Sequence, residues 1–242
     1  MKPRIRCNDN LDELKKLPVG SVDVAYIDPP YFTQRDFGDF NDKWKNIGSF
    51  VEFMEPRLRE LHRVLKPSGT LYMHVDEHAD AYLRVAADKI FEPKNFVNEI
   101  IWAYSGGGAP KNRFASKHDT ILMYARDNSR RKFNTMFAPY KVPGGKHSGG
   151  SPYRDEGKIM DDWWADIPPV STASAERIGY ATQKPEKLVE RVITASSDPG
   201  DVILDAFAGS GTTCSVAKRM GRKSICIDMN PKACNIMKRR LA

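Results

Sequence analysis

The sequence predicts an α/β fold with a doubly wound, mostly parallel sheet. Apolar runs of strand length alternate with amphipathic helical runs along its 242 residues, and this alternation is typical of parallel sheets covered by helices on both faces. One turn between a strand and a helix is glycine-rich, as in the first turn of a Rossmann fold. A chain of this length can bury the core of one such domain.

Hydrophobic patterning predicts the individual elements. Strands are expected at residues 22–27, 70–75, 96–104, 120–124, 202–205 and 224–228, and helices at residues 11–16, 50–65, 78–90, 185–196, 212–220 and 231–240. In the second helix, apolar residues recur at helical spacing from Phe50 to Leu65, which assigns them to the core. Residues 32–48, 105–117 and 126–181 show neither pattern, and a loop as long as the last is unusual unless it is functional.

The most informative segment is Asp28-Pro29-Pro30-Tyr31, which directly follows the first expected strand. An exocyclic amine on a nucleobase is a weak nucleophile, so a catalyst of its methylation must accept hydrogen bonds from its N–H groups. Asp28 supplies a carboxylate, and the two prolines remove backbone donors and leave the Pro29 carbonyl as a second acceptor. Tyr31 offers a flat face for stacking. An ordinary strand-ending turn explains the tetrapeptide equally well when it is considered alone.

The strand at 202–205 leads into a turn that contains Gly209 and Gly211. Asp228 ends the next strand at the spacing expected for an acid that contacts a ribose. Cys214 replaces the third glycine of a dinucleotide fingerprint, and no GxxxxGK[ST] run is present. S-adenosylmethionine, which has no phosphate, therefore suits this turn better than NAD or ATP, with an ordinary glycine-containing loop as the alternative.

In their order along the chain, the two motifs resemble the β-class (permuted) amino-DNA methyltransferases, in which the catalytic tetrapeptide precedes the cofactor turn. The resemblance extends over nearly the whole chain and includes residues 8–18, 65–74 and 182–188. It departs at Ala206 and Ala208, where no polar group is lost. It implies a Rossmann-like S-adenosylmethionine-dependent methyltransferase fold as a single domain over residues 1–242, with residues 126–181 as a target-recognition insertion.

The resemblance implies methylation of the N6 amino group of adenine in double-stranded DNA, with the target base flipped out of the duplex. Asp at the first position of the tetrapeptide is typical of adenine-N6 enzymes, whereas Ser there is typical of cytosine-N4 enzymes. Cytosine-N4 methylation is the nearest alternative. An RNA methyltransferase, a non-catalytic DNA-binding module and a NAD-dependent oxidoreductase are more distant ones.

The resemblance also implies roles for individual residues. The expected catalytic residues are Asp28, Pro29, Pro30 and Tyr31. Asp9 is expected at the adenine end of the cofactor, Asp228 at its ribose, and Lys184 at its methionyl carboxylate, assisted by the N-terminus of the helix that follows. The expected cofactor cradle consists of Asp205, Phe207, Gly209, Gly211 and Thr212.

The charge distribution points to a polyanionic partner. The net charge is +7 and the isoelectric point is near 9.2, and residues 126–158 contain eight Lys or Arg against three Asp or Glu, with aromatic residues interleaved. This composition suits phosphate neutralisation and base stacking, although a solvated charged loop is the alternative. The candidate DNA-binding residues are Arg113, Arg130, Arg131, Lys132, Lys141 and Lys146. A homodimer, or a cognate restriction or specificity subunit, would complete so short a recognition region.

The remaining features exclude other classes of protein. The four cysteines form no CxxC pair and are expected to be buried, unpaired thiols in a reducing compartment. The sequence shows no secretory signal or membrane span, which predicts a cytoplasmic protein without a membrane partner.

Two groups of residues resemble sites but are interpreted as structural. His74, Asp76 and His78 alternate at a strand end and could meet a metal, but hydrogen-bonded polar residues are the better interpretation, so no metal is expected. Trp163 and Trp164 could stack on nucleic acid, but we expect them to pack against the core.

Overall fold

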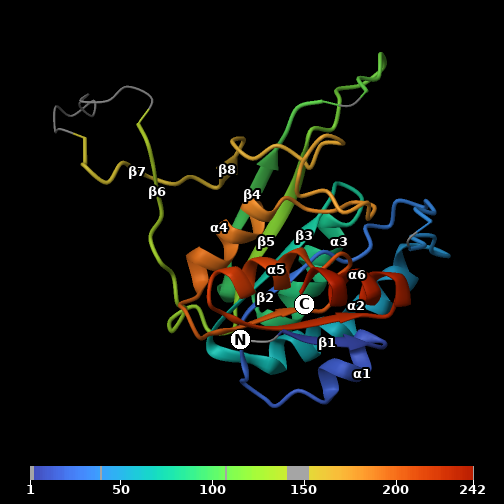
Figure 1. Cartoon of the computed structure of the whole chain (residues 1–242), viewed down its shortest axis with the longest axis horizontal. Coiled ribbons are helices and arrows are strands. Elements are labelled where there is room, and N and C mark those ends of the chain that lie inside the picture. Colours follow the sequence, from blue (N-terminus) through green and yellow to red (C-terminus); the bar gives the residue numbers. More distant parts are fainter. Residues whose placement is uncertain (1–2, 39, 107, 141–152, 242) are drawn as a thin grey trace.

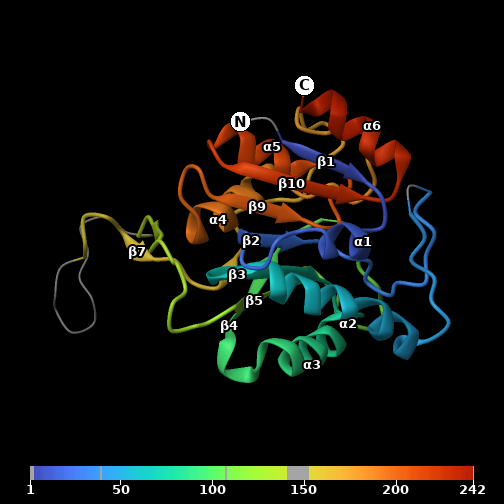
Figure 2. The same ribbon diagram turned by 90° about the horizontal axis from the view of Figure 1, so that it is seen from below.

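A mixed but mostly parallel sheet forms the centre of the computed structural model, which describes residues 3–38, 40–106, 108–140 and 153–241. Its eight strands lie in the order β1-β10-β9-β2-β3-β5-β4-β8, and Figure 2 shows β1 near one edge and β4 near the other. Within this sheet β5 is antiparallel to both of its neighbours, and the other neighbouring strands are parallel. The mostly parallel α/β sheet predicted from the sequence is confirmed.

The elements have the following bounds. The strands of the large sheet are β1 (Arg4–Cys7), β2 (Val22–Ile27), β3 (Leu65–Val75), β4 (Phe96–Ala103), β5 (His118–Ala125), β8 (Trp163–Trp164), β9 (Val202–Asp205) and β10 (Lys223–Asp228). A separate antiparallel pair consists of β6 (Phe137–Ala138) and β7 (Lys158–Ile159). The helices are α1 (Asn10–Lys15), α2 (Ile47–Val64), α3 (Asp80–Phe91), α4 (Glu186–Ser196), α5 (Thr212–Arg219) and α6 (Pro231–Arg240), with a 3-10 turn at Pro93–Asn95.

The six predicted helices and six predicted strands are all present, with ends shifted by a few residues. The sequence analysis missed β1 and the three two-residue strands. Strand β1 reads Arg-Ile-Arg-Cys and pairs with β10 at the edge of the sheet. Its charged residues interrupt the apolar pattern by which a strand is recognised in a sequence. An edge strand tolerates them because it needs only backbone pairing on one side.

Side-chain caps explain where three helices begin. Asp9 accepts a hydrogen bond from the backbone N–H of Leu11 at the start of α1, at 2.8 Å. Asn46 and Ser49 form a reciprocal capping box at the start of α2. Asn230 caps α6, and Pro231 occupies its first turn. These caps satisfy N–H groups that have no partner within the helix.

Helices cover both faces of the sheet (Figure 1). Helices α1, α2 and α3 contribute to one core cluster, and α4 and α5 contribute to a second. Successive residues of β2 alternate between them: Ala25 and Ile27 belong to the first cluster, and Val24 and Tyr26 to the second. All six residues of β2 are buried, as expected of a central strand with both faces covered.

The tandem tryptophans lie in β8, which pairs with the end of β4. Trp164 is buried, and its indole N–H donates to the carbonyl of Asp161 at 2.9 Å. Trp163 is 60% exposed. The expected packing against the core is therefore confirmed for Trp164 and wrong for Trp163, because neighbouring side chains of a strand point to opposite faces.

The four cysteines are paired, contrary to the expectation of unpaired thiols. Cys7 is joined to Cys234 and Cys214 to Cys226, with Cα atoms 6.0 and 6.4 Å apart. Cys214, Cys226 and Cys234 are buried, but Cys7 is exposed. Cys7 and Cys234 lie far apart in the chain, and Cys214 and Cys226 do not have a CxxC spacing. Only the packing of α5, α6, β1 and β10 therefore brings the members of each pair together.

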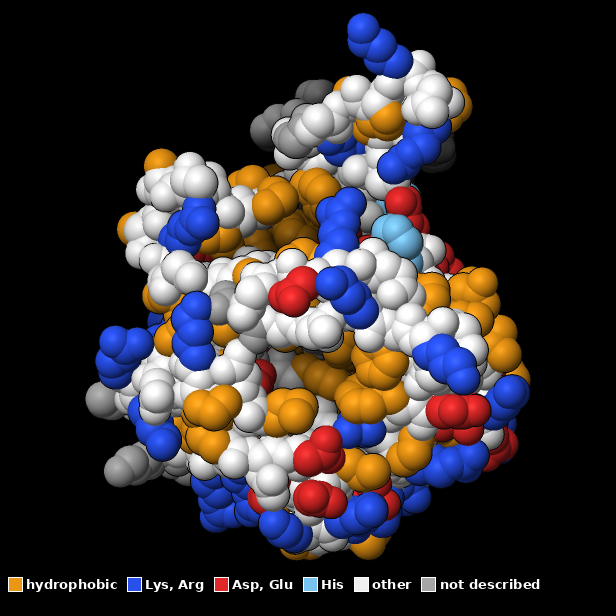
Figure 3. Space-filling view, turned by 90° about the vertical axis from the view of Figure 1, so that its right-hand side faces the viewer, with side chains coloured by type: hydrophobic (Ala, Val, Ile, Leu, Met, Phe, Trp, Pro, Cys, Tyr) orange, Lys and Arg blue, Asp and Glu red, His pale blue; other side chains and the backbone are white. Residues whose placement is uncertain are grey.

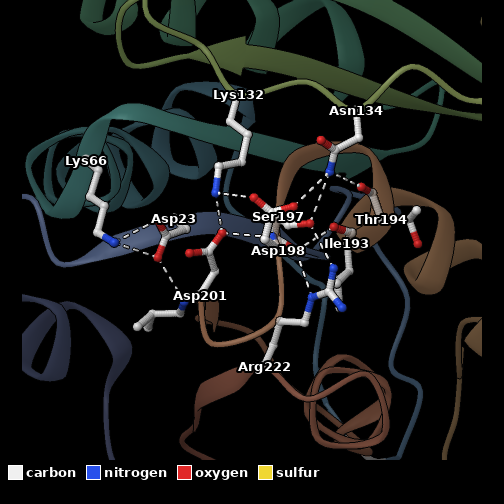
Figure 4. A network of polar contacts seen from close by, with 11 residues as sticks. Asp23, Lys66, Lys132, Asn134, Ile193, Thr194, Ser197, Asp198, Asp201 and Arg222 are labelled. Carbon is white, nitrogen blue, oxygen red and sulfur yellow. Dashed lines mark hydrogen bonds and ion pairs between the residues drawn. The ribbon is translucent and has the colours of Figure 1, made fainter.

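A polar network ties several loops together at the amino ends of the parallel strands (Figure 4). Asp23, near the start of β2, accepts from Lys66 at 2.7 Å and from the backbone N–H of Val202 at 2.9 Å. Lys132 forms ion pairs with Asp198 at 2.9 Å and with Asp201 at 2.7 Å. The segment after β5 is thus attached to the connection between α4 and β9.

Arg222 is a buried member of this network. Its guanidinium donates to the backbone carbonyls of Ser197 and Met220, both at 2.8 Å.

In the described part of the chain, no helix is long and apolar enough to span a bilayer.

We expect Arg222→Met to lower the free energy of unfolding by about 2 kcal/mol, because it leaves buried carbonyl groups without donors. Urea denaturation would measure the change. Lys223→Met, at the neighbouring exposed position, is the matched control and should change stability by less than about 0.5 kcal/mol. Equal effects of the two substitutions would contradict a structural role for the Arg222 contacts.

Candidate active site

The two sequence motifs meet at the edge of the sheet where its parallel strands end, here called the carboxyl edge. Strands β2 and β9 are parallel neighbours, with Val24 opposite Ile203 and Ala25 opposite Leu204. Their carboxyl ends therefore lie side by side, and so do the turns that follow them. The strand order continues from β2 to β3 on one side and from β9 to β10 on the other. A crevice at such a switch point is the usual ligand site of an open α/β sheet.

A cavity of about 560 Å³ lies at this edge, a volume typical of sites for small molecules. Its lining contains every predicted catalytic and cofactor-binding residue except Gly211: Asp9, Asp28, Pro29, Pro30, Tyr31, Lys184, Asp205, Phe207, Gly209, Thr212 and Asp228. Aromatic side chains from residues 37–53 and Tyr180 complete it. The structure thus brings together residues from both ends of the chain.

The turn after β9 depends on its two glycines. Gly209 and Gly211 have φ angles of +47° and +77°, a region that side chains disfavour. A Cβ atom on Gly211 would lie 2.6 Å from Cγ of Met237 in α6, so Gly211 serves close packing against α6. Asp228, at the end of β10, accepts from the backbone N–H of Gly209 at 2.8 Å and so holds the turn.

Asp205 is a deeply buried carboxyl group of the cavity. It accepts from the backbone N–H of Phe207 at 3.0 Å and from the hydroxyl of Thr213 at 2.5 Å. Burial, together with the nearby charges of Asp28 and Asp228, raises its pKa to about 7 despite these hydrogen bonds. Burial also raises the pKa of Asp228.

The start of the chain is attached to the same turn through Asn10. The side-chain amide of Asn10 donates to the carbonyl of Ala206 at 2.8 Å, and its oxygen accepts from Arg57 at 2.6 Å. Arg57 also pairs with Asp9 at 2.8 Å. Sequence analysis assigned residues 50–65 to a core helix and missed this role of Arg57, because a single arginine on a helix carries no local sign of a partner 47 residues earlier.

Within the tetrapeptide, Asp28 is held from two sides. The hydroxyl of Tyr31 donates to Oδ1 of Asp28, and Nζ of Lys184 lies 2.8 Å from Oδ1 and 2.7 Å from Oδ2. Burial and the charge of Asp28 raise the pKa of Tyr31 well above its usual value, so the phenol keeps its proton. Lys184, expected at the cofactor carboxylate, therefore pairs with Asp28 in this structure.

Asp42 organises the segment that follows the tetrapeptide, and sequence analysis missed it. The residue is 1% exposed, and its carboxylate accepts from the backbone N–H groups of Tyr31, Phe32 and Thr33 at 3.3, 3.0 and 2.8 Å. The indole N–H of Trp44 donates to it at 2.9 Å. These bonds hold Phe32 at a φ of +65°, a strained value for a residue with a side chain.

His74 lies beneath the tetrapeptide and is fully buried. Nδ1 is 2.8 Å from the Tyr26 hydroxyl and Nε2 is 2.9 Å from Asp119. Burial lowers the pKa of His74, and the Tyr31 ring lies parallel to its ring with centroids 6.3 Å apart. Within the described chain, no group of three or more His, Cys, Asp or Glu residues is placed to hold a metal.

The candidate DNA-binding residues that the structure describes lie at opposite ends of the parallel strands. Because β5 is antiparallel to β3, the segment that follows it begins at the amino ends of the parallel strands, where Lys132 donates its backbone N–H to Ser68 at 3.1 Å. Arg130 and Arg131 lie in the same segment, away from the cavity. Lys132, expected at DNA, forms the ion pairs of Figure 4 in this structure.

Arg113 lies on the other side, in the loop between β4 and β5. Strand β4 is parallel to β3, so this loop leaves the sheet at the edge where the cavity lies, and Figure 1 shows it extending away from the sheet. Phe114 at its tip is 99% exposed. Lys141 and Lys146 lie outside the described residues. On the face that Figure 3 shows, Lys and Arg side chains surround a hollow with hydrophobic and acidic side chains.

Comparison with known proteins agrees with this geometry. The family model described as DNA methylase matches residues 22–239. The DNA adenine methyltransferase YhdJ of Escherichia coli (strain K12) is 34% identical over 241 residues, which are 96% of this chain and 80% of the relative.

Solved structures share the fold. A protein of Thermus thermophilus described as a DNA modification methylase, complexed with S-adenosyl-L-methionine, has a TM-score of 0.68 at 24% identity, over 99% of this chain and 95% of that chain. The cytosine-N4-specific PvuII DNA methyltransferase has a TM-score of 0.73 at 17% identity, over 100% of this chain and 87% of that chain. At these identities the likeness establishes the Rossmann-like methyltransferase fold and nothing about the target base.

We expect Asp205 to make stability depend on pH. Its folded pKa of about 7 exceeds the ordinary value of 3.8, so the folded state binds this proton more tightly, and stability decreases as pH rises between these values. The slope is at most about 1.4 kcal/mol per pH unit. Urea unfolding of wild type and Asp205→Asn at pH 5 to 8 would show the difference, and parallel pH profiles would contradict this assignment.

Proposed function

The chain belongs to the DNA methylase family, and we propose that it transfers a methyl group from S-adenosyl-L-methionine to the N6 amino group of adenine in double-stranded DNA. One observation carries the proposal: the Asp28 tetrapeptide and the glycine turn after Asp205 line a single cavity. The first suits an exocyclic amine and the second suits an adenosine-containing cofactor. The chemistry and the cofactor site therefore lie together.

The choice of adenine is supported by Asp28 and by the relative from Escherichia coli. Asp at the start of the tetrapeptide is typical of adenine-N6 enzymes, and YhdJ is a DNA adenine methyltransferase. The likeness to the cytosine-N4 enzyme favours neither base, because at 17% identity it shows the fold alone. Cytosine-N4 methylation is thus the alternative that the product must exclude.

The residues of the cavity suit S-adenosylmethionine, which supplies the methyl group from a positively charged sulfonium. Five acidic residues line the cavity, Asp9, Asp28, Asp42, Asp205 and Asp228, and their field favours a cation. Asp228 would hold the ribose hydroxyls from the end of β10, and Asp9 would hold the adenine end. Phe207 offers an apolar face beside the Gly209 turn.

The chain's own groups would orient and polarise the target amine. Asp28 would accept one of its N–H groups and stabilise the positive charge that develops on nitrogen, and the Pro29 carbonyl would accept the other. Tyr31 would keep Asp28 in place through its hydroxyl and offer its ring for stacking. Asp42 would hold the backbone of this segment. The base reaches these groups only when flipped out of the duplex.

DNA would bind at the edge that carries the cavity. The loop between β4 and β5 contributes Lys111, Arg113 and Lys117, and residues 104–117 include no acidic residue. Nζ of Lys117 braces this loop by donating to the carbonyls of Gly106 and, at 3.0 Å, Gly108. A homodimer, or a cognate specificity or restriction subunit, would extend this surface along the duplex.

Sequencing of the modified bases tests the proposed function. Unmethylated genomic DNA would be incubated with the pure protein and S-adenosylmethionine, and we expect N6-methyladenine within one short sequence. N4-methylcytosine as the sole product would select the alternative. No modified base in DNA, together with methylation of RNA, would refute the proposal.

We expect Asp28→Asn to reduce methyl transfer by about a thousandfold, because the amide removes the charge that stabilises the developing cation. Single-turnover kinetics would measure this loss. Cofactor affinity, measured by calorimetry, should not weaken, because the cofactor turn is built by other residues. A parallel loss of both would place Asp28 in the cofactor site instead.

We expect the loop between β4 and β5 to set the salt dependence of DNA binding. Substituting Lys111 and Arg113 together by Met should flatten the slope of log affinity against log salt by about two units if each contacts one phosphate. Lys132→Met is the control and should leave the slope unchanged, since Lys132 lies at the opposite edge. The reverse pattern would restore the segment after β5 as the DNA contact.

A further inference from the structure

Lys184 occupies the position from which Asp28 would act on the target amine. It lies just before Pro185, the N-cap of α4. Its side chain is 10% exposed, and that of Asp28 is 20% exposed. Nζ donates to both oxygens of Asp28, at 2.8 and 2.7 Å. The ammonium is thus buried against the carboxylate that is proposed for catalysis.

This ion pair opposes the proposed role of Asp28. A carboxylate has about four acceptor positions, and Lys184 takes one on each oxygen while Tyr31 takes another on Oδ1. The ammonium also cancels the negative charge that would stabilise a cation developing on the target nitrogen. Nζ of Lys184 further lies 5.2 Å from the ring centroid of Tyr31, over the ring proposed for stacking.

Separation of Lys184 from Asp28 is unfavourable unless another anion takes the place of Asp28. A buried ammonium that loses its partner retains the cost of its desolvation, so an exchange of carboxylates is favoured over simple separation. In this structure a carboxylate already lies at the start of α4. Glu176 accepts from the backbone N–H of Glu186, at 2.9 Å, in the first turn of the helix. Two positive groups at this helix start, Lys184 and the helix N-terminus, therefore both hold carboxylates of the protein.

We propose that Lys184 exchanges Asp28 for the carboxylate at the amino-acid end of the cofactor, so that cofactor binding releases Asp28 and the ring of Tyr31 for the target base. The inference rests on the proposed function and makes Lys184 a positioning residue. It couples the two sites of the cavity: the base binds well only after a ligand with a carboxylate has bound. Coupling of this kind is reciprocal, so target DNA must strengthen cofactor binding by the same factor.

A pair of ligands that differ only in the carboxylate tests this coupling. S-adenosylhomocysteine carries it, and S-adenosyl-3-thiopropylamine lacks it. With either ligand at saturation, wild-type protein is titrated with a duplex that contains 2-aminopurine beside the methylated adenine, whose fluorescence increases when that adenine leaves the stack. We expect the duplex to bind about tenfold more tightly with S-adenosylhomocysteine, a factor typical of coupled sites, and to give a larger fluorescence increase.

Two variants assign the effect to Lys184. Lys184→Met should abolish the difference between the ligands, because Asp28 is then free with either one. Lys187→Met is the matched control: this lysine belongs to the same helix end, and its side chain is 66% exposed. It should keep the tenfold difference. The wild-type comparison stands by itself if Lys184→Met does not fold.

The outcomes separate this inference from the proposed function. Equal duplex affinity with both ligands in wild type would overturn the exchange, as would a tenfold difference that persists in Lys184→Met. In either case methylation of DNA by the wild-type protein would leave the proposed function intact. Absence of DNA methylation would overturn the proposed function, and the exchange with it.

Discussion

The parallel pairing of β2 with β9 is the constraint on which the rest of the site depends. It joins a strand near the start of the chain to one near its end, and both strands lead into turns at the same edge of the sheet. The crevice there is lined by residues that are separated by most of the sequence. Loss of this register would separate the tetrapeptide from the cofactor turn even if each kept its local structure.

The charges of the residues that line this crevice then determine which ligands it favours. Five acidic residues line it, and burial raises the pKa of Asp205 to about 7 and also raises that of Asp228. Without a cationic ligand, part of this charge is balanced within the protein, by Lys184 on Asp28 and by Arg57 on Asp9. A positively charged ligand would therefore balance negative charge that the protein's own side chains neutralise only in part.

Some site residues could not be found from the sequence, and the reason is physical. Asp42 accepts from backbone groups, and Arg57 donates to a residue that is distant in the chain. Neither residue therefore belongs to a motif with a recognisable spacing. The cluster at residues 130–132 has the composition of a DNA contact, but composition does not specify direction. Because β5 is antiparallel, this cluster lies at the edge away from the cavity, where Lys132 is bound by Asp198 and Asp201.

The sequence by itself determined the fold class, the main helices and strands, and the motifs that line the cavity. These features depend on local periodicity and on turn chemistry, which short segments encode. Only the tertiary structure decided the partner of Lys184, the anchoring of the tetrapeptide by Asp42, the pairing of the cysteines, and which basic segment shares an edge with the cavity. Each of these depends on strand order and strand direction, and those are set by packing between segments that are distant along the chain.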